Sequence, residues 1–474
     1  MKNAILITID TLRADHMSCL GYYRKTTPNL DNLAKNGVLF TNAISVGCET
    51  ITSIQSLLSS DYPLEYFVRS EAFKRFDNIP KFDRNTVLEI YKHGTRIAKI
   101  LKNYGYITAA FHSSPLLSRY YNFGTEFDHL DDFITSSVAR KYKIRRKLQK
   151  YKRLFNLARY IYYKIFGVKE SFVGKRAETI NKKVISWLKE WLKENKSNFF
   201  IWIHYMDVHG PYIPPKEFQL YFRSKPLNSS EIQKLLFKRG KNKPEEMSKS
   251  DLGDLFDLYD AEIRYIDHEI KSFLDELSEM GILDDTFVII TADHGEEFGE
   301  HGNFGHGDFG EQYGKLYDEL IHVPLIIYNS PYKNVKVDES VGLVDVAPTI
   351  LDLLGIPVPK SFQGRSLVPL IRGEGKSSGA ISEYLQKGRM VISYRTKEWK
   401  YIFSEGNNKQ ELYNIKNDPG ERENLYEREI EKAMEFELKI KEHISKQGKR
   451  IKGLSGEKER IREKIETLKR IGRI

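Results

Sequence analysis

Three short segments of the sequence carry polar residues suited to hydrolytic chemistry. Asp10 follows a run of β-branched residues near the N-terminus, and the pair Asp293-His294 follows a second run of this kind. Two carboxylates and an imidazole can bind a divalent cation, because they supply hard oxygen and borderline nitrogen ligands. An Asp or an Asp-His pair taken alone is more often a cap or part of a turn, so the metal interpretation depends on the third segment.

The third segment is the loop at 47–53, Gly-Cys-Glu-Thr-Ile-Thr-Ser, which precedes an apolar helical run at 54–58. A hydroxyl at a helix N-terminus faces free backbone N–H groups and the positive end of the helix dipole. This environment suits a nucleophile that attacks an anionic group and then holds it. Thr and Ser are also preferred N-cap residues, so capping is the alternative interpretation of each hydroxyl.

The hydrophobic pattern indicates the scaffold that must position these segments. Strand-like runs, most of them apolar throughout, recur at 4–9, 38–43, 106–111, 199–204, 286–291 and 324–328. Continuous apolar runs are typical of strands buried on both faces, and helix-period segments such as 97–104 and 255–277 separate them. The pattern predicts an α/β fold with a largely parallel sheet, in which ligands bind beyond the carboxyl ends of the strands. Asp10 and Asp293 both occupy such positions.

The chain changes character after residue 373. Short strand-like runs separated by turn residues occur at 390–394, 399–403 and 411–415, and they predict a small antiparallel subdomain. We therefore expect a catalytic domain over 1–373, the antiparallel subdomain over 374–425 and a charged helix over 426–474. The charged helix is either solvated or forms a partner-binding coiled coil.

A basic insertion at 140–165 stands out within the first domain. It is rich in Lys and Arg and has no acidic residue, and its apolar residues recur at spacings of three and four. This pattern predicts an amphipathic helix with a cationic face. The helix either packs on the catalytic domain with its charges in water or contacts a membrane surface or a polyanion.

Composition sets the outer limits on function. The chain has 474 residues, 40% of them hydrophobic, and a formal charge of +10, so it is neither disordered nor fibrous and can accept acidic partners. Two cysteines, Cys19 and Cys48, are too few for a disulfide framework. The first apolar run is too short for a signal peptide, and no run reaches the roughly 18 residues of a membrane span. We expect a cytoplasmic protein, with peripheral membrane contact through 140–165 as an option.

Several motifs occur in a common order along nearly the whole chain. They are Ile9-Asp10-Thr11-Leu12-Arg13, Ser56-Leu57-Leu58-Ser59, Asp207-Val208-His209-Gly210-Pro211-Tyr212, Asp293-His294-Gly295-Glu296, Gly299-Glu300-His301-Gly302 and Glu411-Leu412-Tyr413-Asn414. In this order and spacing the sequence resembles the sulfatase family of the alkaline phosphatase superfamily. Any one of the motifs alone would be weak, whereas their shared order is specific. The resemblance implies an alkaline-phosphatase-like α/β fold with a mixed, largely parallel sheet flanked by helices.

The resemblance also implies a metal centre and a nucleophile. One divalent ion, Mn, Ca, Mg or Zn, would be held by Asp10, Asp293, His294 and the oxygen of Thr50. Counting back along the Cys-x-Pro-Ser-Arg signature of the family places Thr50 at the nucleophile position. Cys48 is two residues out of register and lacks the Pro or Ala and the Arg that formylglycine conversion requires. We therefore predict the Thr-nucleophile subgroup and a packing role for Cys48.

Further site residues follow from the same resemblance. His209 matches the family histidine that faces the substrate ester, and His306 stands where the family has a lysine. Both are predicted to be catalytic and to bind substrate, because histidine can donate to an anion or protonate a leaving alcohol. Arg13 is a further predicted substrate contact that could equally be structural. The histidines predicted to be structural are His112, His204, His301 and His322.

A Thr nucleophile favours phosphoryl substrates, because phospho-Thr can be attacked at phosphorus by water or an alcohol. We predict a metal-dependent sulfatase-family hydrolase of sulfuric or phosphoric mono- and diesters that forms an intermediate on Thr50. Its partner is an anionic ester, with glycan- and lipid-linked esters as options, and no nucleic acid is expected. A head-group transferase acting on lipids or glycans is one alternative. A non-catalytic protein that binds membrane or nucleic acid is the other, and the complete set of site residues argues against it.

Overall fold

The computed structural model describes residues 2–69, 84–92, 96–134, 174–194, 197–306, 315–386, 389–405 and 409–454. The chain forms two compact units. Unit 1 comprises Met1–Leu39, Ala98–Gln312 and Pro324–Val335, and unit 2 comprises Phe40–Ile97, Tyr313–Val323 and Lys336–Ile474. The predicted basic helix at 140–165 lies outside the described residues, and the predicted domain boundaries at 373 and 425 stay predictions.

A largely parallel sheet forms the core of unit 1. Its strands lie in the order β9 (His322–Tyr328), β6 (Thr286–Ala292), β1 (Asn3–Ile9), β5 (Phe199–Tyr205), β3 (Ile107–His112) and β4 (His129–Asp131). All neighbours are parallel except β6 and β9, which are antiparallel. The central strands β1, β5 and β6 are buried over their whole length, as their continuous apolar sequences require. The predicted α/β class is therefore confirmed.

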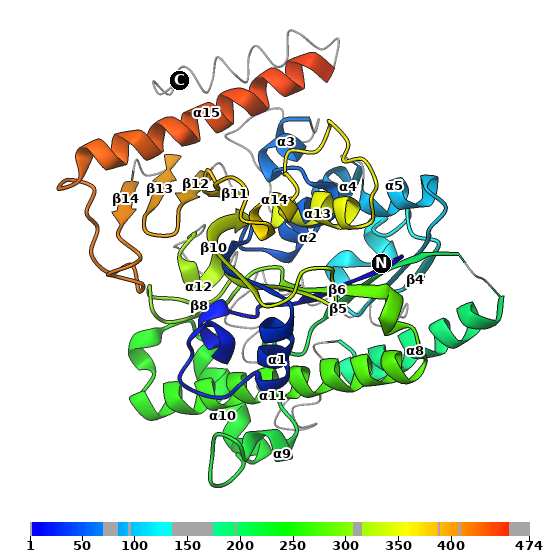
Figure 1. Cartoon of the computed structure of the whole chain (residues 1–474). Coiled ribbons are helices and arrows are strands. Elements are labelled where there is room, and N and C mark those ends of the chain that lie inside the picture. Colours follow the sequence, from blue (N-terminus) through cyan, green and yellow to red (C-terminus); the bar gives the residue numbers. More distant parts are fainter. Residues whose placement is uncertain are drawn as a thin grey trace. The chain divides into compact units, whose positions relative to one another are not determined.

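Helices flank this sheet (Figure 1). The long helix α11 (Lys249–Glu279) packs against α1 (Pro28–Asn36), α8 (Ala177–Glu194), α9 (Lys216–Gln219) and α10 (Ser229–Gly240). A capping box between Ser248 and Asp251 begins α11. Further along α11, Asp267 accepts hydrogen bonds from the backbone N–H groups of Asn29 (3.1 Å) and Leu30 (2.8 Å). The carboxylate thus caps the N-terminus of α1, which the helix dipole favours.

Unit 2 contains the small antiparallel sheet expected near the C-terminus. Its strands are β11 (Ala380–Gln386), β12 (Arg389–Arg395), β13 (Lys400–Ser404) and β14 (Lys409–Tyr413), paired in that order. Helix α15 (Ile430–Leu454) lies along this sheet and packs on β12, β13 and α3 (Pro63–Arg69) (Figure 1). The other elements that lie wholly or mostly in unit 2 are β2 (Val38–Ile44), α2 (Thr50–Ser59), α4 (Arg84–Lys92), α12 (Asp318–Ile321), β10 (Val335–Gly342), α13 (Val346–Leu353) and α14 (Val368–Ile371).

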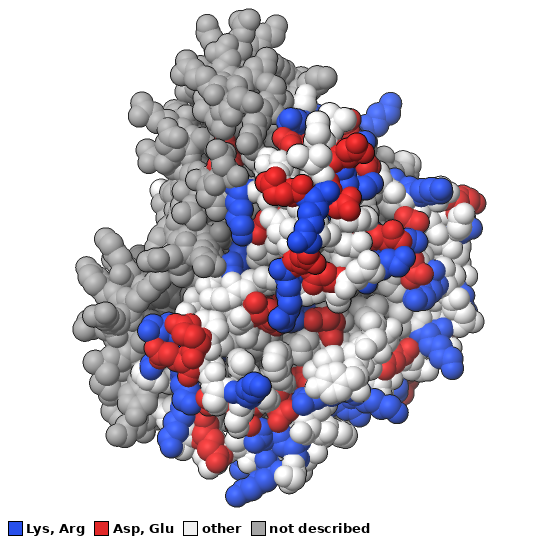
Figure 2. Space-filling view, turned by 90° about the vertical axis from the view of Figure 1, so that its left-hand side faces the viewer, with Lys and Arg blue, Asp and Glu red and all other residues white. Residues whose placement is uncertain are grey.

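The described surface carries charges of both signs. On the face drawn in Figure 2, basic and acidic side chains are interspersed over the described residues, and neither sign dominates. Within the described ranges, no helix combines the length and the apolar content that crossing a bilayer takes.

A buried ion cluster stabilises unit 2 and leads to a first prediction. The Lys400 ammonium is fully buried between Asp318 (2.9 Å) and Glu421 (2.7 Å). Lys400→Met removes the positive charge that pairs with the Asp318 and Glu421 carboxylates. We therefore expect the free energy of unfolding, measured by urea denaturation, to fall by about 3–5 kcal/mol. The control is Lys416→Met, which removes an ion pair to Glu398 whose lysine side chain is 65% exposed. That pair should contribute less than about 1 kcal/mol, and equal losses in both variants would contradict the role of Lys400.

Candidate functional site

The register of the unit 1 sheet brings two predicted ligands together. In the parallel sheet, Ile9 of β1 pairs with Tyr205 of β5 on one side and with Ala292 of β6 on the other. Asp10 and Asp293 directly follow Ile9 and Ala292, so both carboxylates emerge at the same edge. Each is almost completely buried. The predicted position beyond the carboxyl ends of adjacent strands is confirmed for these two residues.

Asp10, Asp293 and His204 form a group that could hold a metal ion. One ligand atom from each residue lies within 4.8 Å of the other two. The His204 Nε2 atom is 3.4 Å from Asp10 Oδ2, and the Nδ1 atom lies 2.9 Å from the Thr8 hydroxyl. A structural role was predicted for His204, whereas the structure places its ring beside Asp10, because β5 is the neighbour of β1. No local pattern in the sequence signals that neighbourhood.

His294 completes the cluster. Its Nδ1–H donates to the carbonyl oxygen of Gly295 at 2.9 Å, because a carbonyl can only accept. The remaining ring nitrogen, Nε2, lies 3.5 Å from Asp293 Oδ2 and 3.8 Å from Asp10 Oδ1. A histidine whose second nitrogen is tied to a backbone carbonyl in this way is typical of metal ligands.

The electrostatics of the cluster fit a cation. Burial raises the pKa of Asp293, and the charge of Asp10 adds to this effect. Burial alone would raise the pKa of Asp10 too, but the nearby His209, His204 and His294 hold it below its usual range. Among the described residues, no donor makes a hydrogen bond to either carboxylate oxygen of Asp10. A cation would stabilise a buried, charged carboxylate in this arrangement, and the Asp and His ligands suit a divalent one.

The two predicted substrate histidines lie beside this cluster. The rings of His209 and His306 are 5.2 Å apart, and the rings of His294 and His306 are 4.4 Å apart. His209 Nδ1 donates to the carbonyl oxygen of Gly210 at 2.7 Å. Burial lowers the pKa of His209, with Asp10 opposing the shift, so its neutral form is favoured.

His306 has the opposite charge preference. Burial alone would lower its pKa, but Glu296, whose Oε1 is 3.0 Å from His306 Nδ1, raises it above the usual value. The imidazolium form is therefore favoured more than in a free histidine. This supports the interpretation that His306 takes the place of a lysine beside the substrate.

A set of supporting residues around Glu296 was not predicted. Glu296 accepts from Tyr212 OH (2.9 Å) and is paired with Arg239 Nη2 (3.1 Å). Burial alone would raise the pKa of Glu296, but Arg239 and His306 lower it to about 2. Arg239 comes from α10, whose sequence shows only an ordinary amphipathic helix. Its role depends on helix packing, which no motif in the sequence signals.

The Arg13 guanidinium forms several hydrogen bonds within unit 1. It binds both carboxylate oxygens of Asp15, at 2.8 and 2.7 Å, and donates from Nη1 to Glu300 (2.6 Å) and to the carbonyl oxygen of Glu296 (3.1 Å). These contacts match the structural alternative for Arg13, and its substrate-binding role stays a prediction.

Thr50 and Cys48 belong to unit 2. Thr50 begins α2 and is buried, so its hydroxyl lies at a helix N-terminus as predicted, although the helix starts at Thr50 and not at residue 54. The loop before it is held by Ser45, which donates from Oγ to the carbonyl oxygen of Gly47 at 2.7 Å. Cys48 is buried in an apolar cluster that includes Ile44 and Leu316, which agrees with a packing role. That Thr50 joins Asp10, Asp293 and His294 around one metal ion stays a prediction.

Comparison with known families gives two matches. The family described as Sulfatase matches residues 2–356, which is most of the chain. A second family, described as N-sulphoglucosamine sulphohydrolase, C-terminal, matches residues 299–449.

A curated relative is also similar to part of this chain. Arylsulfatase K of Bos taurus is 32% identical over 183 residues, which is 36% of this chain and 33% of that protein. The match thus spans about a third of the length of this curated relative.

Two solved structures share the fold over nearly the whole chain. A protein in complex with its substrate D-glucosamine-2-N,6-O-disulfate has a TM-score of 0.66 at 20% identity, covering 94% of this chain and 98% of that chain. A phosphonate monoester hydrolase of Agrobacterium radiobacter has a TM-score of 0.66 at 19% identity, covering 94% of this chain and 95% of that chain. Both likenesses confirm the predicted alkaline-phosphatase-like fold.

Proposed function

Because the chain belongs to the sulfatase family, we propose that it is a metal-dependent hydrolase of sulfuric or phosphoric esters with Thr50 as its nucleophile. The observation that carries the proposal is the buried group of Asp10, Asp293, His204 and His294 beside His209 and His306. A cluster of this kind combines metal ligands with groups that can neutralise an anionic ester. Members of the family generally bind a divalent metal, so the predicted activity and the ligand chemistry agree.

Asp10, Asp293, His294 and the Thr50 hydroxyl would hold one divalent ion, with His204 as an additional candidate ligand. When bound, such an ion polarises the ester and lowers the pKa of the attacking hydroxyl. The mixed carboxylate and imidazole set suits manganese, magnesium or zinc, and the imidazole argues mildly against a site built for calcium alone.

The protein residues supply the remaining chemistry. The Thr50 oxygen attacks phosphorus or sulfur, forms a Thr–O ester and displaces the alcohol, which takes up a proton. His306, favoured as an imidazolium, would stabilise the negative charge on the ester oxygens. His209 Nε2 is the candidate that takes up the proton of the Thr50 hydroxyl and passes it to the leaving alcohol, because its Nδ1–H donates to Gly210 and leaves Nε2 to accept. Water then attacks the phosphorus or sulfur atom and regenerates Thr50.

The substrate class is proposed from chemistry and from the relatives. A Thr intermediate favours phosphate esters, because phospho-Thr can be hydrolysed at phosphorus. Many sulfatases have Gly-Lys-Trp-His after the Thr-Ala of strand β3, and here Phe111 and Ser113 stand at the positions of the Lys and His that clamp sulfate, which points the same way. The disulfated glucosamine bound by one structural neighbour supports a glycan-linked ester as the natural substrate.

A parallel assay tests this proposal. The protein is incubated with manganese and with an aryl phosphate, an aryl phosphodiester and an aryl sulfate, and the three rates are compared with the rates after chelation. We expect metal-dependent cleavage that is fastest for one of the phosphate esters. Faster cleavage of the sulfate would contradict the phosphoryl preference while retaining the hydrolase. No cleavage with Mn, Mg, Zn or Ca would contradict the hydrolase itself.

Two further proposals concern location. A cytoplasmic position, with peripheral membrane contact through 140–165, rests on the composition of that segment and on the two cysteines. The basic segment would bring the protein to a lipid-linked ester if it binds anionic lipid, since each basic residue near such a surface contributes about 1 kcal/mol.

A further inference from the structure

The loop that carries His209 has no regular secondary structure to hold it. It runs from Asp207 to Ile213 after the end of β5, and His209 donates its backbone N–H to the carbonyl oxygen of Met206 at 3.1 Å. A histidine that transfers a proton must lie within about 3 Å of its target, so its loop has to be fixed from outside.

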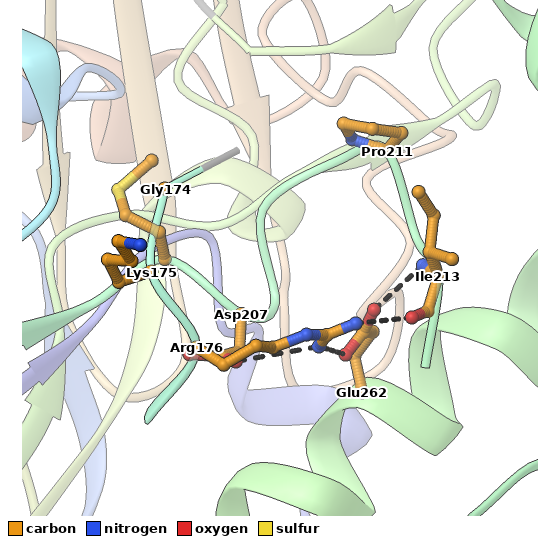
Figure 3. Close-up of a pocket in the computed structure, with 8 residues that line it drawn as sticks. Gly174, Lys175, Arg176, Asp207, Pro211, Ile213 and Glu262 are labelled. Atoms are coloured by element: carbon orange, nitrogen blue, oxygen red, sulfur yellow. Dashed lines mark hydrogen bonds and ion pairs between the residues drawn. The ribbon is translucent and has the colours of Figure 1, made fainter. Parts of the chain in front are cut away.

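Arg176 binds both ends of this loop (Figure 3). At the start of the loop, Arg176 Nη1 is 3.5 Å from Asp207 Oδ1. At the end of the loop, Arg176 Nη2 donates to the carbonyl oxygen of Ile213. The guanidinium group thus spans the two points between which the chain carries His209.

Glu262 of α11 anchors this arrangement to the helical layer. Its Oε2 accepts from Arg176 Nη1 at 2.6 Å, and its Oε1 accepts from the backbone N–H of Ile213 at 2.7 Å. Asp207 in turn accepts from the backbone N–H of Ala177, at the start of α8, at 3.1 Å. Three segments of unit 1 therefore meet here: the loop from Asp207 to Ile213, α11, and the start of α8, which Arg176 precedes.

The charge of Arg176 stabilises the ionised forms of two buried carboxylates, Asp207 and Glu262. The side chains of Asp207 and Glu262 are almost completely buried. Burial raises the pKa of Asp207 to about 6 and that of Glu262 to about 7, and in both cases the charge of Arg176 opposes the shift. Without the arginine, both carboxylates would tend to become protonated and would hold the loop less well.

We propose that Arg176 is a positioning residue that keeps His209 in place to pass the proton it receives from Thr50 to the leaving alcohol. The inference rests on the proposed function, because it assigns the proton transfer to His209. Arg176 does not touch the reacting atoms, so its effect must pass through the loop from Asp207 to Ile213. Its planar fork reaches three acceptors at once, which a lysine ammonium on a flexible stem cannot reproduce.

The test is a double-mutant cycle with two aryl esters of the class that the wild type cleaves. One ester has a good leaving group, p-nitrophenol, and the other has a poor one, phenol. Arg176→Ala should lower kcat for the phenyl ester by about 10²-fold, the loss that a misplacement of about 1 Å can cause. The loss should be much smaller for the p-nitrophenyl ester, which hardly needs protonation. In the His209→Ala background, Arg176→Ala should cost less than about threefold, because coupled residues are not additive.

A matched control separates positioning from general stability. Arg223 also bridges two acidic residues of α11, Asp254 (2.6 Å) and Asp257 (2.9 Å), and its side chain is 17% exposed against 18% for Arg176. Arg223→Ala should therefore leave the ratio of the two ester rates unchanged. If Arg176→Ala does not fold, Glu262→Gln serves in its place, since the amide oxygen can still accept from Ile213 while the ion pair is lost.

The possible results distinguish failure of the positioning role from failure of the proposed function. Losses that are equal for both esters, or that add fully to the loss in His209→Ala, would overturn the positioning role and leave the hydrolase intact. A wild type that cleaves no ester would instead overturn the proposed function. A His209→Ala variant with full activity would overturn this inference, because Arg176 would have no proton donor to position.

Discussion

Replacing Thr50 with alanine is expected to lower kcat for ester cleavage by about 10³-fold or more, because removal of a nucleophile eliminates the covalent route. Cys48→Ser should keep most of the activity. Cys48 is buried in an apolar cluster, and a serine hydroxyl of similar size should disturb the packing there without removing the nucleophile. The measurement is the steady-state rate with whichever aryl ester the wild type cleaves best.

Mass spectrometry supplies an independent check on the same pair of residues. Rapid acid quenching during turnover should trap a modified peptide that contains Thr50, and this peptide should be unmodified in Thr50→Ala. Cys48 should be unmodified in the wild type. Equal loss of activity in Thr50→Ala and Cys48→Ser, or a formylglycine at Cys48, would refute the assignment of Thr50.

The metal centre should be equally sensitive to its ligands. Asp293→Asn and His294→Ala are each expected to lower both the metal content and kcat by orders of magnitude, because each removes one of about four ligands. Elemental analysis of the purified, folded protein measures the metal directly. His204→Ala should also lower the metal content if His204 Nε2 is a ligand, and an unchanged content would make it a neighbour only.

The control for these variants is His16→Asn. His16 forms a buried pair with Asp260 at 2.7 Å in the same unit, so its loss perturbs a comparable His–Asp contact without touching the cluster. Metal content should stay at the wild-type level in this variant. Full occupancy in both Asp293→Asn and His294→Ala would contradict the proposed centre.

The sequence by itself determined the scaffold and the two carboxylates. Short apolar runs rich in β-branched residues are typical of buried strands, and the predicted runs at 4–9 and 286–291 match β1 (Asn3–Ile9) and β6 (Thr286–Ala292) closely. Asp10 and Asp293 directly follow these strands, so their place at one sheet edge could be predicted. Three strands of the antiparallel sheet near the C-terminus were predicted too, whereas β11 was missed because its mixed polar sequence gives a weak signal.

Only the tertiary structure decided which other side chains reach this edge. His204 meets Asp10 because β5 is the neighbour of β1, and Arg239 meets Glu296 because α10 folds back over the His209 loop. Arg176 lies 31 residues from Asp207 and 86 from Glu262 in sequence, yet it joins both. The physical reason is that hydrophobic periodicity is a local property of the chain, which sets each element. Ion pairs between buried side chains depend on strand order and helix packing, which are set by contacts far apart in sequence.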